Sequence, residues 1–175
     1  MSAVSAKMKH TISVLVENRF GVLARVSGLF SARGYNIISL CVGETEDPSV
    51  SRMTVVVRGD KGVLTQIMKQ LNKLVEVIEV LDLTATSFLE RELILLKVSA
   101  PAAKRTEVVE IASIFRAKIV DVDSDSMVVE VTGAEGKINA LVDMMRPYGI
   151  QELVRSGEIA IARSSRAGYN DTSNE

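Results

Sequence analysis

The sequence predicts an α+β protein that consists of two tandem βαββαβ units. Hydrophobic residues make up 47% of the 175 residues, whereas aromatic residues make up only 4%. The core must therefore be built from aliphatic side chains, which favour sheets covered by helices. Segments with strand-like and helix-like spacing of apolar residues follow one another in the order βαββαβ, and this order occurs twice. We place the units at residues 9–84 and 85–163, and we expect the polar residues 164–175 to form a disordered tail.

The first unit begins with a short β-branched segment bounded by Asn18 and Gly21, which is typical of a buried strand followed by a loop. Apolar residues then recur at helical spacing up to Gly34, a residue type that commonly ends a helix. Two β-rich segments flank a turn that contains Pro48, which predicts a hairpin. A second segment with apolar residues at helical spacing predicts another helix, and a segment in which apolar and polar residues alternate predicts the last strand of the unit. In order, these predicted elements span residues 11–17, 20–32, 36–45, 49–58, 63–74 and 75–83.

The second unit repeats this order after a junction at residues 85–91. Its first helix is expected to begin at Pro101, because proline is favoured in the first turn of a helix. A polar turn at residues 123–126 joins the two middle strands. The pattern of the last strand is interrupted at Ser156 and Gly157. The predicted elements of this unit span residues 92–100, 101–116, 118–122, 127–132, 134–146 and 152–163.

The order βαββαβ is that of the ferredoxin-like plan, in which helices cover one face of a sheet. The opposite face is expected to stay open in each unit. Because the predicted strands are rich in aliphatic residues, such a face is expected to associate with another chain. We therefore predict an oligomer.

Composition and charge exclude several classes of protein. The 21 Lys and Arg residues against 22 Asp and Glu residues give a formal net charge of -1, which excludes the strongly basic surface of a dedicated nucleic-acid-binding protein. The single cysteine, Cys41, excludes an intramolecular disulfide framework and a cysteine-based zinc site. No segment resembles a secretion signal or a membrane-spanning helix, so we expect a cytoplasmic protein.

Sequence motifs for catalysis and for metal binding are missing as well. We find no glycine-rich nucleotide loop, no zinc-protease motif and no nucleophile elbow. The lone His10 borders the first strand, where a surface position is expected, and Cys41 lies inside a strand pattern, where a small buried residue is expected. We therefore predict no catalytic residue and no metal ligand in this chain.

One segment has the features of a ligand site. Residues 17–23 pass from a strand into a helix, so the backbone N–H groups near Gly21 lie at a helix N-terminus, which favours a bound carboxylate. Gly21 would allow a ligand to approach the backbone closely, and the side chain of Asn36 both donates and accepts hydrogen bonds, as an amino acid ligand requires. The alternative is that Asn18 caps the helix and that Asn36 belongs to a turn after Gly34.

Three strings of residues resemble one protein family. They are Asn-Arg-Phe-Gly-Val-Leu at 18–23, Leu-Phe-Ser-Ala-Arg-Gly-Tyr-Asn-Ile at 29–37 and Ser-Arg-Met-Thr at 51–54. Together they are highly specific, and they resemble the small regulatory subunit of acetolactate synthase, also called acetohydroxyacid synthase, whose N-terminal half is an ACT domain. The resemblance extends over residues 9–163, so residues 9–84 are the expected ACT domain.

The resemblance implies a regulatory subunit without catalytic residues, acting in the biosynthesis of valine, leucine and isoleucine. Such a subunit binds a catalytic large subunit that holds thiamine diphosphate, Mg and FAD, and no cofactor is expected in this chain. It activates that partner and confers feedback inhibition by valine or another branched-chain amino acid. The effector would lie between the ACT domains of a homodimer. Its expected contacts are Asn18, Gly21, Val22 and Leu23 from one chain and Asn36 and Ile37 from the other.

Two other functions are considered beside this one. A stand-alone amino-acid-sensing ACT protein, for instance a transcriptional regulator, would need a DNA-recognition helix, which neither half supplies. A small ferredoxin-like enzyme would need a convergent cluster of titratable side chains, which the sequence does not reveal. We keep the stand-alone amino acid sensor as the alternative function, and we expect no nucleic acid or membrane partner.

Overall fold

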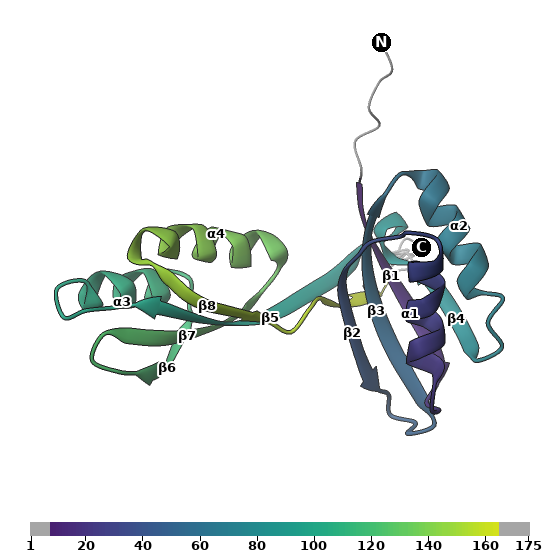
Figure 1. Ribbon diagram of the computed structural model, residues 1–175, viewed down its shortest axis with the longest axis horizontal. Helices are drawn as coiled ribbons and strands as arrows, with labels where there is room; N and C mark the ends of the chain where they lie inside the picture. Colours follow the sequence, from purple (N-terminus) through teal and green to yellow (C-terminus); the bar gives the residue numbers. More distant parts are fainter. Residues whose placement is uncertain (1–7, 165–175) are drawn as a thin grey trace, which may run out of the picture.

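The computed structural model describes residues 8–164, which fold into two lobes (Figure 1). The elements of the first lobe are β1 (Met8–Glu17), α1 (Val22–Ala32), β2 (Ile37–Glu44), β3 (Val50–Gly59), α2 (Lys61–Leu71) and β4 (Val77–Asp82). Its strands form an antiparallel sheet in the order β2-β3-β1-β4, and both helices lie on one face of that sheet. The tail predicted at residues 164–175 lies outside the described residues, apart from Ser164.

The second lobe repeats this arrangement after a short 3-10 helix, η1 (Leu83–Ala85). Its elements are β5 (Phe88–Ser99), α3 (Arg105–Ile114), β6 (Lys118–Val122), β7 (Ser126–Gly133), α4 (Glu135–Met145), the 3-10 helix η2 (Arg146–Tyr148), β8 (Ile150–Arg155) and β9 (Ile159–Ala162). The sheet order is β6-β7-β5-β8, and β9 pairs with the beginning of β5. The predicted α+β fold of two tandem ferredoxin-like units is confirmed. No helix among residues 8–164 is long and apolar enough to cross a membrane.

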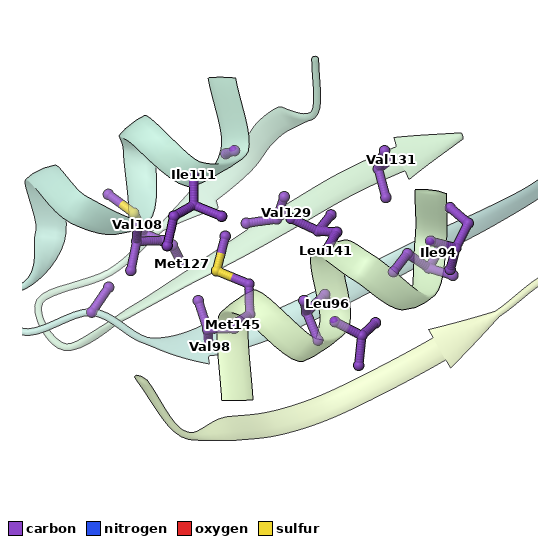
Figure 2. Packing of buried hydrophobic residues seen from close by; sticks show 14 residues of the cluster. Ile94, Leu96, Val98, Val108, Ile111, Met127, Val129, Val131, Leu141 and Met145 are labelled. Carbon is purple, nitrogen blue, oxygen red and sulfur yellow. The ribbon is translucent and has the colours of Figure 1, made fainter. Parts of the chain in front are cut away.

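Each lobe has an aliphatic core between its sheet and its helices. In the first lobe, Ile12 and Val14 of β1 lie opposite Val55 and Met53 of β3, and all four side chains are buried. In the second lobe, side chains of β5 and β7 pack against α3 and α4 (Figure 2). These include Ile94, Leu96, Val98, Val108, Ile111, Met127, Val129, Val131, Leu141 and Met145. Alternate residues of a strand point to the same face, so the spacing of apolar residues decides which face receives the helices.

The ends of the first-lobe helices have local causes. α1 starts two residues after the predicted position, because Gly21 adopts a left-handed φ of 85° just before it. The helix ends before Gly34, whose φ is 67°, as the glycine position predicts. α2 begins after Asp60, whose side chain accepts a hydrogen bond from the backbone N–H of Val63 at 2.8 Å.

Three predictions for the second unit are wrong in their boundaries. The helix predicted from Pro101 begins four residues later, because the intervening residues form a turn in which the N–H of Lys104 donates to the carbonyl of Pro101 at 2.8 Å. The single strand predicted at 152–163 is divided into β8 and β9, because the chain turns at Gly157, whose φ is 84°. Residues 88–91 of the predicted junction belong to β5, since β9 returns to pair with them.

The helix-free faces of the two sheets differ. In the second lobe, Leu95 and Val154 lie opposite each other on this face with exposed fractions of 38% and 50%, as expected for an open face. In the first lobe, Thr11 lies on this face but is buried, because the side chains of Glu158 and Thr84 hydrogen-bond to it. The expectation of an open face is therefore wrong for this part of the first lobe, which the chain itself covers.

Candidate functional site

The start of α1 presents backbone donors beside open space. Gly21 precedes the helix with a φ of 85°, and no side chain among residues 8–164 caps the helix. The N–H of Val22 donates to the carbonyl of Arg19 over a long 3.4 Å. A Cβ atom added to Gly21 would meet nothing within 4 Å beyond its chain neighbours. These features suit the predicted anion site, because uncapped N–H groups and the helix dipole favour a carboxylate.

Asn18 connects the loop before α1 to the turn between β2 and β3. Its side-chain amide donates to the carboxylate of Glu44 at 3.0 Å and to the carbonyl of Pro48 at 2.9 Å. Its backbone N–H donates to the carbonyl of Ser49 at 2.7 Å. The alternative in which Asn18 caps α1 is therefore wrong. Asn18 instead holds the position of the loop that carries Gly21.

The side chains on either side of Gly21 differ in their exposure. Val22 is buried in the core of the first lobe, so only its backbone lies at the start of the helix. Leu23 has an exposed fraction of 45%, and Phe20 is fully exposed. Leu23 and Phe20 therefore offer apolar surface next to the backbone donors.

Asn36 and Ile37 lie at the other end of α1. The chain leaves the helix through a turn in which the N–H of Gly34 donates to the carbonyl of Ser31 at 3.1 Å, so Asn36 does follow a turn. Asn36 is exposed nevertheless, and it lines a cavity of about 250 Å³ beside Arg58. Ile37 is half-buried against the core of the first lobe.

The structure brings residues 18–23 together and residues 36–37 together, but it separates these two groups by the length of α1. The helix has 11 residues. At a rise of 1.5 Å per residue this amounts to about 16 Å. A single free amino acid is too short to contact both ends within one chain, so a site that contains both groups needs two chains.

The two residues considered for metal binding or nucleophilic chemistry have structural positions. His10 is buried rather than at the surface, because β1 begins earlier than predicted, and its Nε2 donates to the carbonyl of Gly59 at 3.2 Å. Cys41 is half-buried within β2. Within residues 8–164, no group of three His, Cys, Asp or Glu side chains is arranged to hold a metal ion.

A polar cluster between the two lobes has no counterpart among the predicted site residues. Lys9 and Thr11 of β1 and Ser39 of β2 hydrogen-bond there to Glu158, at the wall of a cleft of about 240 Å³. The signal for it in the sequence is the interruption of the last strand pattern at Ser156 and Gly157, directly before Glu158. Because the partners are far apart in the sequence, that signal does not reveal the contact.

Two family models match the chain, one on each lobe. The model described as an AHAS small subunit-like ACT domain matches residues 12–79. The model described as the small subunit of acetolactate synthase matches residues 91–164. Both lobes therefore match the same family, and the first lobe is an ACT domain.

Relatives and a solved structure match over nearly the whole chain. A probable acetolactate synthase small subunit from Archaeoglobus fulgidus is 58% identical over 159 residues, which cover 91% of this chain and 99% of that relative. The acetolactate synthase small subunit from Mycolicibacterium smegmatis is 49% identical over 157 residues, which cover 90% of this chain and 92% of that relative. The crystal structure of the acetolactate synthase small subunit from Thermotoga maritima has a TM-score of 0.80 at 38% identity and covers 89% of this chain and 98% of that chain. This chain therefore belongs to the family of acetolactate synthase small subunits, as its sequence strings predict.

Proposed function

We propose that this chain is the regulatory subunit of a cytoplasmic acetolactate synthase that it forms with a catalytic large subunit. It raises the activity of that subunit and makes it sensitive to valine or another branched-chain amino acid. Thiamine diphosphate, Mg and FAD belong to the catalytic partner. The observation that carries this proposal is the membership of both lobes in the small-subunit family. Residues 9–84 are the ACT domain, which binds the effector, forms the dimer and activates the catalytic subunit, and residues 85–163 are the C-terminal ferredoxin-like domain.

The proposed effector site requires a dimer of ACT domains, because residues 18–23 and 36–37 lie at opposite ends of α1. In a dimer whose two-fold axis runs perpendicular to α1, the start of α1 from one copy would lie beside the end of α1 from the other copy. Residues 18–23 of one chain would then meet Asn36 of the second chain. β2 forms an edge of the first-lobe sheet and exposes Ile38 and Val42 at 45% and 41%. Exposed edge strands tend to pair with another chain, which supports β2 as the centre of the dimer interface.

The chemistry of these groups suits a branched-chain amino acid. The backbone N–H groups at the start of α1 would receive the carboxylate of the effector. The side-chain amide of Asn36 from the second copy would hydrogen-bond to the polar end of the effector, since it can both donate and accept. Leu23 and Ile37 would contact the branched aliphatic side chain. A charged or strongly polar side chain would find no such apolar contact.

A carboligation assay tests this function. The purified catalytic subunit is assayed for the formation of acetohydroxy acids from pyruvate, with and without this chain, and the complete enzyme is titrated with valine, leucine and isoleucine. We expect no turnover by this chain alone, higher activity of the complete enzyme, and inhibition by at least one of the three amino acids. Turnover by the chain alone, or unchanged activity when it is added, would contradict the proposal. A monomer at micromolar concentration in analytical ultracentrifugation, with effector present, would contradict the dimer.

A further inference from the structure

The segment between β8 and β9 is held against the first lobe by a buried carboxylate. Glu158 has an exposed fraction of only 7%. One carboxylate oxygen accepts a hydrogen bond from the hydroxyl of Thr11 at 2.8 Å, and the other accepts one from the ammonium of Lys9 at 2.6 Å. The backbone N–H of Glu158 donates to the hydroxyl of Ser39 at 2.8 Å. Both β1 and β2 of the first lobe therefore hold a residue that lies between β8 and β9 of the second-lobe sheet.

Lys9 connects the first lobe to another element of the second lobe. Its ammonium also donates to the carboxylate of Glu135 at the start of α4, at 2.7 Å. Burial lowers the pKa of Lys9, but the hydrogen bonds to Glu135 and Glu158 outweigh burial, and the net effect raises this pKa. Lys9 is therefore charged at neutral pH, and Glu158 is the more buried of its two partners. Removing one partner of such a pair leaves an uncompensated charge, which is unfavourable.

The backbone of Gly157 lies directly against β2. A Cβ atom added to Gly157 would lie 2.9 Å from the hydroxyl oxygen of Ser39 and 3.5 Å from the carbonyl oxygen of Leu40. A side chain at this position would therefore displace the Ser39 hydroxyl, which accepts the hydrogen bond from the N–H of Glu158, or shift the segment itself. Gly149 offers a contrast, because its φ of 93° is similar to the 84° of Gly157 but an added Cβ would approach only Ser99, at 3.8 Å and within the second lobe.

These contacts begin two residues from the proposed effector site. β2 starts at Ile37, and Ser39 and Leu40 are the residues of β2 that approach the Gly157 and Glu158 segment. Ile37 and Ser39 pair with neighbouring residues of β3 on either side of a register shift, and only Ile38 separates them along the chain, so a displacement of the start of β2 lies one residue from Ser39. On the far side, Glu158 leads into β9, which pairs with β5, and β5 extends from the second lobe to the first (Figure 1).

We propose that one interlobe contact transmits the effector signal from β2 to the second lobe. Its residues are Lys9, Thr11, Ser39, Gly157 and Glu158. This proposal rests on the proposed function, because it needs an effector bound at the start of β2. The bound effector favours one position of β2. Because the interlobe contact joins β2 to the segment before β9, and β9 pairs with β5, the second lobe responds to that position. The catalytic partner thereby responds to an effector that it does not itself bind.

Substitution of Glu158 by glutamine in the complete enzyme tests the interlobe contact. Glutamine keeps the size of the side chain and can still accept the hydrogen bond from Thr11, but Lys9 loses its buried counter-charge. The effector is the strongest inhibitor found in the carboligation assay. For Glu158→Gln we expect unchanged activation of the catalytic subunit, an effector dissociation constant within about threefold of the wild type, and maximal inhibition reduced by about half or more.

Two matched controls separate this effect from a general loss of stability. Glu92→Gln removes an ion pair, 2.7 Å to Arg155, that lines the same cleft but joins two strands of the second lobe, β5 and β8, and it should keep full inhibition. Gly157→Ala should reduce inhibition, whereas Gly149→Ala, with a similar backbone conformation, should not. Full inhibition in folded Glu158→Gln and Gly157→Ala would overturn the proposal. An equal loss of inhibition in Glu92→Gln would overturn it as well, because any ion pair would then have the same effect.

Hydrogen exchange on the wild-type enzyme keeps the proposal testable if these variants do not fold. Adding the effector should change the protection of the backbone amides in residues 156–162, in addition to those of β2. A change confined to β2 would overturn the interlobe contact as the route of the signal. If none of the three amino acids inhibits the wild-type enzyme, the proposed function itself is contradicted, which is a different result from normal inhibition in the variants.

Discussion

Substitution of Gly21 by aspartate should abolish feedback inhibition while leaving the ACT domain folded. Gly21 has a φ of 85°, a region that costs most L-residues about 1–2 kcal/mol but that Asp and Asn adopt more readily. A Cβ atom at this position meets nothing within 4 Å, so no steric clash adds to that cost. This conformational cost is small compared with the free energy of unfolding of a typical domain, which is ~5–15 kcal/mol. The variant is therefore expected to fold.

The effect on the effector follows from the charge of the new side chain. The carboxylate that Gly21→Asp introduces would lie at the start of α1, where the carboxylate of the effector is proposed to bind. Two like charges about 4 Å apart repel by roughly 4 kcal/mol at an effective dielectric constant of about 20. Since every ~1.4 kcal/mol is a factor of ten in affinity, binding should weaken by at least about a hundredfold. Gly21→Asn has the same size and backbone preference without the charge, and it should weaken binding far less.

Isothermal titration calorimetry of the full chain with its best effector measures both dissociation constants, and circular dichroism checks that both variants are folded. A folded Gly21→Asp variant with an unchanged dissociation constant would show that the effector binds elsewhere. An equal loss of affinity in Gly21→Asn and Gly21→Asp would refute the electrostatic argument, because bulk alone would then explain the result.

Three further outcomes are expected. Asn36→Ala should raise the half-inhibitory concentration about tenfold to a hundredfold, since an unsatisfied polar group costs about 1–3 kcal/mol, and inhibition curves should reach the same maximum. Leu141→Ala should lower the free energy of unfolding by about 2–5 kcal/mol in urea titrations, because Leu141 is fully buried in the core of the second lobe (Figure 2). The raised pKa of Lys9 means that its ion pairs stabilise the fold below the ordinary value of 10.5 and lose this contribution as the pH rises through the raised value. On the alkaline side of neutral pH, the difference in urea midpoint between the wild type and Lys9→Met should therefore stay constant up to about pH 10.5 and shrink above it.

The parts of the fold that the sequence predicts well are those with local causes. The alternation of Ile12, Val14 and Val16 and the helical spacing before Gly34 both follow from the geometry of a single element, and both elements lie close to their predicted positions. The division of the last predicted strand was missed because β9 is defined by its pairing with residues 88–91, far away in the sequence. A strand pattern does not reveal which partner completes it.

The candidate site likewise combines features with local causes, which the sequence predicts, and contacts between distant segments, which it does not predict. The helix N-terminus near Gly21 is a local feature, and the structure has it where the sequence predicts it, whereas the left-handed conformation of Gly21 is a finding of the structure. The role of Asn18 depends on Glu44 and Pro48, which reach it only through the β2–β3 turn, so the cap expected from its position alone does not form. The burial of Glu158 depends on partners in two distant strands, Lys9 and Thr11 of β1 and Ser39 of β2, and a single sequence gives no measure of that proximity.

The connection between the two lobes favours transmission of the effector signal from one lobe to the other over independent movement of the lobes. A flexible linker would let one lobe move without the other, since such linkers behave as random coils. Here β5 pairs with β9 at its beginning and with β7 and β8 further on, so the connection is itself part of a sheet. The hydrogen bonds of Glu158 add directional contacts to that connection, and directional contacts are either formed or broken. Allosteric coupling energies are typically about 1–3 kcal/mol, and one charge-assisted hydrogen bond contributes about that much. The proposed signal therefore needs the effector to favour only one state of this interlobe contact, without any larger rearrangement of either core.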